Sequence, residues 1–335
     1  MSRIGIVGAG SWGTALAMVL ARRGGHNICM WSHTRRVADA IRQSGENRFY
    51  LPGLPVPNTV RITTQLKECI DEAEILILAV PSEHLRGVCL AMLPFLTKDQ
   101  LIVNATKGIE DGTYLRMTQV LHEVLDQENL RLPCGVLSGP SFAQEVGAGS
   151  PTAIAIASSD ASVAARVQEE FAGPTLRLYT NHDVVGVELG GALKNVIAIA
   201  AGATHGLGLG HNSVAALVTR GIAEMTRLAV ACGGERETLA GLAGLGDLVL
   251  TCTGALSRNR HVGMELGSGR RLPEILADMH GKVAEGVRTT HAAMGVARGL
   301  GVEMPITEQV AAVLNERISA KDAMKELMSR PGRDE

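Results

Sequence analysis

Residues 4–13 read Ile4-Gly5-Ile6-Val7-Gly8-Ala9-Gly10-Ser11-Trp12-Gly13, a β-branched apolar run that ends in a Gly-x-Gly-x-x-Gly turn. An amphipathic segment, Thr14–Arg23, follows the turn. In such a motif the first glycine permits a tight turn, the second lets the backbone approach a pyrophosphate, and the third lets helix and strand pack closely. The pyrophosphate then binds the unpaired N–H groups at the helix N-terminus. Strand, turn, helix and second strand come in the right order, which predicts a dinucleotide site at Gly8, Gly10 and Gly13.

Short apolar runs alternate with helix-length amphipathic segments in the first half of the chain. We expect strands at Arg3–Val7, Asn27–Trp31, Ile75–Val80, Leu101–Ala105, Gly135–Ser138, Ala153–Ala157 and Leu176–Tyr179. This alternation indicates an α/β domain with a doubly wound, largely parallel sheet and helices on both faces. After the polar turn near residue 182 the pattern is helical nearly throughout. We therefore predict a dinucleotide-binding domain over 1–182 and an all-helical substrate-binding domain over 183–335.

Composition narrows the possible partners. The 335 residues include 32 basic and 34 acidic side chains, so the formal net charge is −2. Such a balance gives no general attraction for nucleic acid or for an anionic membrane. No apolar run without glycine or charge reaches the roughly 18 residues that a transmembrane helix needs. The six cysteines are scattered without Cys-x-x-Cys spacing, which is typical of reduced thiols. We expect a cytoplasmic protein with no nucleic-acid partner and no membrane insertion.

The segment after the second predicted strand bears on the choice of cofactor. NAD-selective sites usually carry an acidic residue about 20 residues beyond the glycine motif, bonded to the ribose 2′-hydroxyl. From Thr14 to Ala38 there is no Asp or Glu, and the strand ends in Trp31-Ser32-His33-Thr34-Arg35-Arg36. His33 and one of the arginines can accept a 2′-phosphate. This predicts that NADP is used at least as well as NAD; the alternative is a solvated basic turn.

Lys194 lies in the middle of a very apolar helical segment, Leu189–Ala198. Helical spacing places small or apolar residues beside it: Gly190, Gly191, Ile197 and Ala198. A lysine buried without a partner is costly, and burial tends to lower its pKa. Held near a carbonyl, it can donate a proton to the nascent alkoxide as hydride arrives, and take it back in reverse. The alternative is a lysine that snorkels at a helix–helix seam.

Further polar residues can bind a phosphate-bearing substrate. Lys107 follows a predicted strand, at the edge where ligands bind in open α/β sheets. Ser257-Arg258-Asn259 opens a helix, whose free N–H groups and arginine form an anion site. Asp247 can hold the Lys194 ammonium or bond a substrate hydroxyl. The plainer alternatives are a surface lysine and a capped, solvated helix start.

Two weaker segments complete the candidates. Ser138–Phe142 ends a strand, and its backbone and hydroxyl can line the ligand crevice. His205 and His211 flank a glycine-rich turn, with no carboxylate or cysteine at ligand spacing. We therefore expect these histidines to be structural or exposed, and we predict no metal site.

These motifs resemble, from end to end, the bacterial NAD(P)-dependent glycerol-3-phosphate dehydrogenase family. Two long and specific segments carry most of the resemblance, Gly190–Ala198 and Ala243–Thr253. The other matching segments are Gly8–Gly13, Ala105–Gly108, Ser138–Phe142, Ser257–Arg260, Val283–Gly286 and Gly301–Glu308. The resemblance implies an N-terminal Rossmann-type domain, a helical C-terminal domain of the 6-phosphogluconate-dehydrogenase type, and a homodimer.

The resemblance also implies a reaction and a set of roles. The reaction is reversible reduction of dihydroxyacetone phosphate to sn-glycerol 3-phosphate, feeding glycerophospholipid synthesis, with Lys194 as proton donor and acceptor. The implied substrate contacts are Lys107, Gly139, Ser141, Lys194, Asp247, Ser257, Arg258 and Asn259. The implied cofactor contacts are Ser11, Trp12, His33, Lys107, Ala143, Arg258, Val283 and Glu285. A β-hydroxyacid-type dehydrogenase of the same architecture is the nearest alternative, and a non-catalytic redox sensor is a more distant one.

Overall fold

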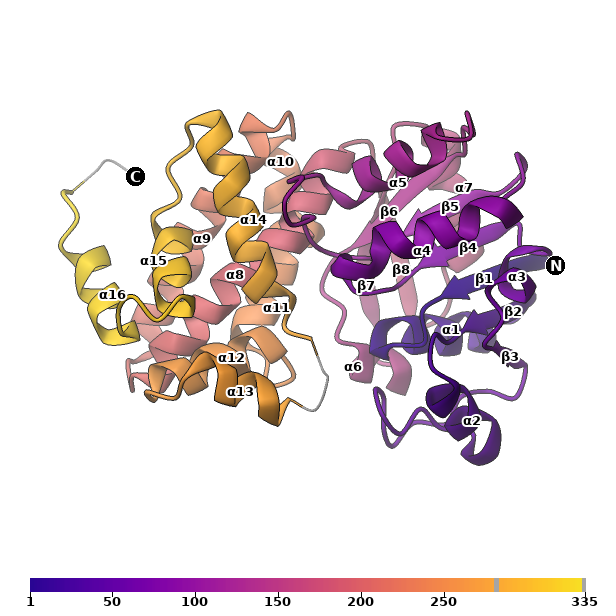
Figure 1. The fold of residues 1–335 in the computed structure, drawn as a ribbon, viewed down its shortest axis with the longest axis horizontal. Coiled ribbons are helices and arrows are strands. Elements are labelled where there is room, and N and C mark those ends of the chain that lie inside the picture. Colours follow the sequence, from indigo (N-terminus) through magenta and orange to yellow (C-terminus); the bar gives the residue numbers. More distant parts are fainter. Residues whose placement is uncertain (280–282, 333–335) are drawn as a thin grey trace. The chain divides into compact units, whose positions relative to one another are not determined.

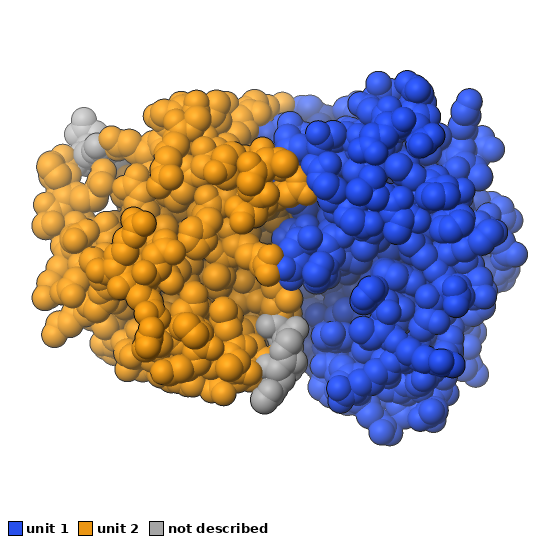
Figure 2. All heavy atoms as spheres, viewed as in Figure 1, with its two compact units in different colours: residues 1–107, 115–188 blue, residues 108–114, 189–335 orange. Residues whose placement is uncertain are grey.

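The computed structural model describes residues 1–279 and 283–332 and divides the chain into two compact units. Unit 1 comprises residues 1–107 and 115–188, and unit 2 comprises residues 108–114 and 189–335 (Figure 2). This division differs from the domains expected from the sequence in two respects. The break falls a few residues after 182, inside a helix that starts at Val184, and the loop 108–114 groups with unit 2, where the Tyr114 ring lies beside Gly295. The domain limits 1–182 and 183–335 stay a prediction.

Unit 1 is built on the strand–turn–helix expected at residues 4–13, here β1 (Ser2–Val7) and α1 (Ser11–Arg23). Within the described residues, eight strands form one sheet in the order β3-β2-β1-β4-β5-β6-β7-β8. The remaining strands are β2 (His26–Trp31), β3 (Val60–Thr63), β4 (Ile75–Leu78), β5 (Leu101–Asn104), β6 (Cys134–Ser138), β7 (Thr152–Ala157) and β8 (Leu176–Asn181). Neighbouring strands are parallel except β6 and β7. The doubly wound fold class is confirmed, and the strand order reverses between β1 and β4, the usual place for a ligand.

Helices cover both faces of this sheet (Figure 1). Side chains alternate along each strand, so that Ile4 and Ile6 face one core while Val7 faces the other. The first core includes residues of α1, α2 (Arg35–Ser44), α6 (Ala143–Ala148) and α7 (Ala161–Phe171). The second includes residues of α3 (Leu66–Ile70), α4 (Leu85–Met92) and α5 (Met117–Asp126). Single turns at Ser82–His84 and Leu93–Phe95 flank α4.

Unit 2 is organised around α8 (Val184–Gly206), and its further described elements are all helical. By length and composition α8 could cross a membrane, but 83% of its most apolar window is buried inside the structure, as in the core helix of a globular domain. The other helices are α9 (His211–Ala231), α10 (Arg236–Ala240), α11 (Asp247–Thr253), α12 (Arg258–Gly267), α13 (Leu272–Asp278), α14 (Glu285–Leu300), α15 (Pro305–Leu314) and α16 (Ala320–Met328). A π-helical turn, Leu242–Gly246, precedes α11. The expectation of a helical second half is confirmed.

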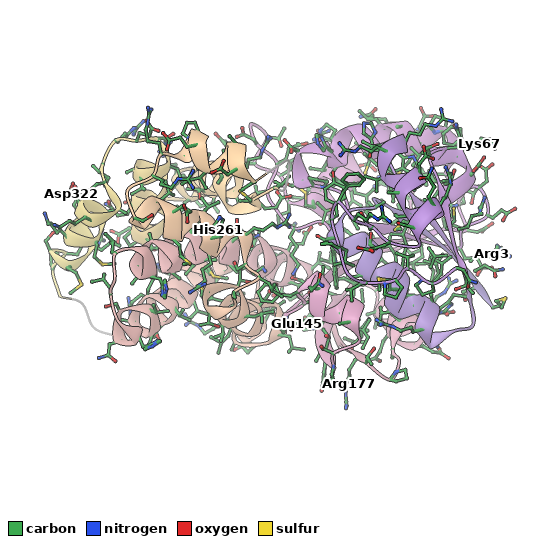
Figure 3. The ribbon with its side chains drawn as sticks, turned by 90° about the horizontal axis from the view of Figure 1, so that it is seen from below. Arg3, Lys67, Glu145, Arg177, His261 and Asp322 are labelled. Atoms are coloured by element: carbon green, nitrogen blue, oxygen red, sulfur yellow. The ribbon has the colours of Figure 1, made fainter. Side chains whose placement is uncertain are left out.

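Ion pairs at the surface add little to this framework. Arg3 and Lys67 lie at the periphery of unit 1, and Asp322 lies on α16 in unit 2 (Figure 3). Their ion-pair partners are Glu74 for Arg3, Asp71 for Lys67 and Lys325 for Asp322. The side chains of Arg3, Lys67 and Asp322 are all solvent-exposed. Exposed pairs of this kind contribute about 0–1 kcal/mol. The buried apolar cores therefore fix the elements that carry the site.

Candidate active site

The glycine turn of unit 1 has the backbone that its sequence predicts. Gly8 has φ +123°, a conformation that residues with a side chain rarely adopt. A Cβ added to Gly13 would lie 1.9 Å from the Gly8 carbonyl oxygen, so only glycine lets α1 approach the turn. A Cβ added to Gly10 would meet nothing within 4 Å. Open space thus lies beside Gly10, where a pyrophosphate is expected, and no side chain of the described residues caps the start of α1.

Asn47 holds this turn in place, and no motif in the sequence pointed to it. Its Nδ2 donates to the Ala9 carbonyl at 3.0 Å and to the Thr14 hydroxyl at 2.8 Å. Its Oδ1 accepts the backbone N–H of Tyr50 at 3.2 Å. The side chain is fully buried, so its contacts with Ala9 and Thr14 are shielded from water. Asn47 therefore ties the loop after α2 to both the turn and the first turn of α1.

The basic residues after β2 lie at the same edge of the sheet as the glycine turn. Trp31 pairs with Val7 in the register of β1 and β2, and its carbonyl accepts the Gly8 N–H at 3.2 Å. His33, two residues further on, is exposed, and its ring meets that of Trp31 edge-on at 5.8 Å. Arg35 is also exposed and lies 3.8 Å from Asp39. Hydrogen-bond donors, one of them positively charged, thus lie at the end of β2, where NAD-selective sites carry an acidic residue.

A second polar group in unit 1 follows β5 and β6. The Lys107 ammonium donates to the Gly139 carbonyl at 3.3 Å, and the Ser141 hydroxyl donates to the same oxygen at 2.8 Å. Gly139 has φ +145°, and a Cβ there would lie 2.9 Å from the Ile154 Cα. Ala143 is the first residue of α6, just beyond. The structure therefore brings together Lys107, Gly139 and Ser141 at the carboxyl edge of the sheet, as expected from their positions in the sequence.

Lys194 lies inside unit 2 in a buried, hydrogen-bonded cluster. Its ammonium donates to Asp247 Oδ1 at 2.7 Å and to the Thr251 hydroxyl at 2.8 Å, and that hydroxyl donates to the Asp247 carbonyl at 2.6 Å. The residues are 8%, 1% and 3% exposed, respectively. The ammonium is held by a buried carboxylate rather than carried to solvent, which distinguishes it from a snorkelling lysine.

The glycine-rich run before Asp247 makes this cluster possible. A Cβ added to Gly190 of α8 would lie 2.5 Å from the Ala243 carbonyl oxygen, so the two backbones touch. Residues 242–246 form a π-helical turn, a geometry that often marks functional positions. Asp247 then begins α11, and Thr251 follows four residues later on the same helical face. The sequence suggested the contact of Lys194 with Asp247, whereas Thr251 was missed because α11 was not predicted.

The predicted anion site opens α12 in unit 2. The Ser257 hydroxyl oxygen accepts the Arg260 N–H at 3.1 Å and so caps the helix. Asn259 Nδ2 donates to Asn195 Oδ1 at 2.9 Å, and Asn259 Oδ1 accepts the Gly286 N–H at 2.9 Å. Asn259 therefore connects the starts of α12 and α14 to α8. Its contact on α8 is Asn195, the residue that follows Lys194. The hydrogen bond of Asn259 with Asn195 was not expected from the sequence.

Arg258 keeps an accessible surface beside this network. Crowding by neighbouring atoms lowers the pKa of its guanidinium through desolvation, and the negative charge of Glu285 opposes that shift. Glu285 begins α14, and Val283 precedes it. The start of α12 thus presents one cation together with the N–H groups of a helix end, a combination that suits a phosphate ester.

The two candidate histidines lie at helix ends in unit 2. His205 lies in the last turn of α8 and His211 begins α9, and both are exposed. In the part of the chain that the structure describes, no three His, Cys, Asp or Glu residues gather closely enough to hold a metal ion.

Two family models match the chain over most of its length. The model described as NAD-dependent glycerol-3-phosphate dehydrogenase N-terminus matches residues 3–164, and the model of the C-terminus matches residues 183–325. The chain belongs to the NAD-dependent glycerol-3-phosphate dehydrogenase family. The resemblance seen in the sequence motifs is thereby confirmed.

Individual members of this family are similar over the full chain. A protein of Acidobacterium capsulatum named glycerol-3-phosphate dehydrogenase [NAD(P)+] is 62% identical over 338 residues, and the match covers 100% of both chains. One of Koribacter versatilis with the same name is 58% identical, covering 100% of this chain and 99% of that one. The crystal structure of glycerol-3-phosphate dehydrogenase from Coxiella burnetii has a TM-score of 0.93 at 41% identity, covering 98% of this chain and 99% of the other. As a member of this glycerol-3-phosphate dehydrogenase family, the chain is an oxidoreductase that uses NAD or NADP.

Proposed function

We propose that this chain catalyses the reversible reduction of dihydroxyacetone phosphate to sn-glycerol 3-phosphate, with Lys194 as the proton donor and acceptor, in the supply of glycerophospholipid synthesis. The observation that carries the proposal is the buried Lys194–Asp247–Thr251 cluster. A buried ammonium held by a carboxylate is a costly arrangement, and groups of this kind concentrate at functional sites.

The residues around the glycine turn suit a dinucleotide. The N–H groups at the start of α1, with Gly8, Gly10, Ser11, Trp12 and Gly13, would hold the pyrophosphate in the open space beside Gly10. His33, with an arginine of the same turn, would accept the 2′-phosphate of NADP. Ala143, Lys107, Arg258, Val283 and Glu285 complete the proposed cofactor contacts. When bound, the reduced nicotinamide supplies the hydride.

The residues of this chain then bind the ketone and manage its proton. Arg258 and the N–H groups at the start of α12 would hold the phosphate, with Ser257 and Asn259 beside it. Lys107, Gly139 and Ser141 would contact the rest of the three-carbon substrate. Lys194 donates a proton to the carbonyl oxygen as it gains negative charge, and recovers it in the reverse direction. Asp247 and Thr251 fix the direction of the Lys194 ammonium, and Asp247 stabilises its charged form.

A comparison of substrates tests this proposal. We expect kcat/KM for dihydroxyacetone phosphate to exceed that for dihydroxyacetone by about a thousandfold or more, because each lost hydrogen bond to a charged group costs roughly 1.5–3 kcal/mol. A β-hydroxyacid-type dehydrogenase would instead prefer a 2-oxo or 3-oxo carboxylate in the same assay. A redox sensor would bind the reduced cofactor without turnover of any ketone. Equal rates with phosphorylated and non-phosphorylated ketones would reject the phosphate assignment.

We also infer a cytoplasmic homodimer. The homodimer rests on the family resemblance, and the location is supported by the free thiols of all six cysteines, which suit a reducing compartment. Sedimentation of the purified chain should give twice the mass of one chain. A monomer at assay concentration would contradict the homodimer.

A further inference from the structure

Two cysteines of unit 1 lie together on the sheet face covered by α3. Cys29 of β2 is the register partner of Gly5 of β1. A Cβ added to Gly5 would lie 2.4 Å from the Cys69 carbonyl oxygen, so α3 rests directly on β1. The Cys69 thiol lies within hydrogen-bond distance of two carbonyl oxygens, 3.4 Å from that of Cys29 and 3.6 Å from that of Ile6, and both cysteines line one pocket. The fold therefore holds the two cysteines side by side, and proximity is the first requirement for a disulfide.

The two thiols differ in their surroundings. Cys29 is 7% exposed and lines a pocket at the amino ends of β1, β2 and β3, together with Arg61, Glu68 and Glu72. Cys69 lines the same pocket but is only 2% exposed. The interaction with the Cys69 thiol and the positive charge of Arg61 lower the pKa of the Cys29 thiol, and they outweigh the opposing effects of burial and of the Glu68 and Glu72 carboxylates. The same interaction and burial raise the pKa of the Cys69 thiol. The pocket wall thus contains both cysteines, and Cys29, which has the more acidic thiol, is the more exposed of the two.

Three other cysteines have thiols that are less acidic than usual, unlike Cys29. Burial raises the pKa of Cys89 and of Cys252 to about 12, and it also raises the pKa of Cys134. Because the thiolate is the reacting form, these groups are poor nucleophiles at neutral pH. They serve as internal controls for any reaction at Cys29.

We propose that Cys29 and Cys69 are a hydroperoxide-reactive pair, in which Cys29 is the attacking thiol and Cys69 the resolving thiol. The Cys29 thiolate attacks one oxygen of hydrogen peroxide; an S–O bond forms, the O–O bond breaks, and hydroxide leaves. The Cys69 sulfur then attacks the Cys29 sulfenic acid, so that a disulfide forms and water leaves. Overall two thiols lose two electrons and two protons, and one peroxide becomes two molecules of water. A dithiol reductant reverses the change.

The disulfide would link the middle of β2 to α3, on the sheet face that α3 covers. It would close the segment between Cys29 and Cys69, which contains α2, β3 and the exposed His33 and Arg35. The proposal needs only the geometry of unit 1. It therefore stands or falls independently of the ketone that the enzyme reduces.

Peptide mapping of the full chain tests the proposal directly. The reduced protein is treated with a modest excess of hydrogen peroxide at neutral pH, its remaining thiols are blocked, and it is digested without reductant. We expect a single new crosslink, between the peptides that hold Cys29 and Cys69, and a fall in titratable thiols from six to four, because one disulfide consumes two. A crosslink between other cysteines, or no crosslink while Cys29 stays reduced, would overturn the proposal.

Two substitutions of the resolving residue separate its roles. In Cys69→Ser the hydroxyl can still donate to the Cys29 thiolate, so we expect iodoacetamide to alkylate Cys29 as fast as in the parent, and peroxide to leave a sulfenic acid that dimedone traps. In Cys69→Ala the donor is lost, so alkylation of Cys29 should slow severalfold. Equal alkylation rates in the two variants would remove Cys69 from the activation of Cys29. Cys252→Ser is the matched control, and it should leave the crosslink unchanged.

Discussion

Lys194 and Asp247 form a buried pair, so a substitution of either residue acts on stability as well as on chemistry. Lys194→Ala removes the proposed proton donor, and general acid catalysis is typically worth about 10²–10⁴-fold in rate. The same change leaves the Asp247 carboxylate buried without its cation, which costs about 3–5 kcal/mol. We expect kcat to fall by at least that rate factor, the unfolding temperature to fall as well, and NADPH binding to persist. Steady-state kinetics, thermal unfolding and cofactor titration measure the three effects.

An apolar replacement of the whole pair tells the two roles apart. Lys194→Met combined with Asp247→Leu removes both charges, and such replacements of buried ion pairs are often neutral or stabilising. We expect this double variant to regain most of the lost stability and none of the lost turnover. A double variant with near parental turnover would show that Lys194 is not the proton donor.

The side chains after β2 allow a prediction on cofactor choice. His33→Asp with Arg35→Ala places an acid where NAD-selective sites carry one and removes a cation that can meet a 2′-phosphate. We expect KM for NADPH to rise about tenfold relative to that for NADH, the effect of about 1.4 kcal/mol. Arg42→Ala is the control. Arg42 lies in the last turn of α2, at the end away from Arg35, so its loss should leave the ratio unchanged. If both cofactors shift by the same factor in the double variant, the 2′-phosphate assignment is wrong.

At the scale of elements, the sequence predicted those with a strong hydrophobic pattern and missed those without one. β1, β2 and α8 carry long apolar runs or a glycine motif with a mechanism. β3 is four residues with an exposed arginine, so it has too few positions to show alternation. α11 follows three glycines in six residues, a composition that favours a turn, and tertiary contact with α8 overrides that preference. The antiparallel pairing of β6 and β7 has no local signature.

Site residues were also predicted where the local sequence is distinctive and missed where it is not. Lys194, Asp247 and the start of α12 belong to unusual local sequences, and the contact of Lys194 with Asp247 was one of the two roles that the sequence left open for Asp247. Thr251 could be found only once Asp247 was known to begin a helix. Asn47 sits in an irregular loop, and its contacts with Ala9 and Thr14 arise from folding over more than thirty intervening residues. Long-range side-chain contacts of this kind leave no periodic trace in the sequence.

The packing of α8 against α12 gives a prediction for these elements. A Cβ added to Gly263 of α12 would lie 1.9 Å from the Ile199 carbonyl oxygen, so Gly263→Ala must push the two helices apart. We expect a loss of about 1–3 kcal/mol in the free energy of unfolding, as for other overpacked contacts, with a rise in KM for the ketone because Lys194 and Asn259 lie on these helices. The exposed Gly299 of α14 is the matched control, since a Cβ there meets nothing within 4 Å. Gly299→Ala should be neutral or stabilise by up to about 1 kcal/mol. Equal effects of the two substitutions would contradict the close packing of α8 and α12.

The whole molecule consists of two compact units with separate cores, so ligands of one unit need not stabilise the other equally. Larger chains with several domains often unfold in more than one step. NADPH at about 100 times its dissociation constant should stabilise the unit that binds it by about 2.7 kcal/mol. Since the proposed pyrophosphate site lies in unit 1, we expect amides of β1, α1 and β2 to gain protection from hydrogen exchange on adding NADPH. The core of α9 and α15 in unit 2 should change less.

A variant of the glycine turn makes this expectation specific to the proposed site. In Gly13→Ala the new methyl group would collide with the Gly8 carbonyl oxygen, which displaces the N–H groups at the start of α1. NADPH should then give little protection anywhere in the chain, while the exchange pattern of unit 2 without ligand stays that of the parent, because its core is separate. Protection by NADPH that survives in Gly13→Ala, or that appears first in α9 and α15 of the parent, would place the dinucleotide outside the glycine turn.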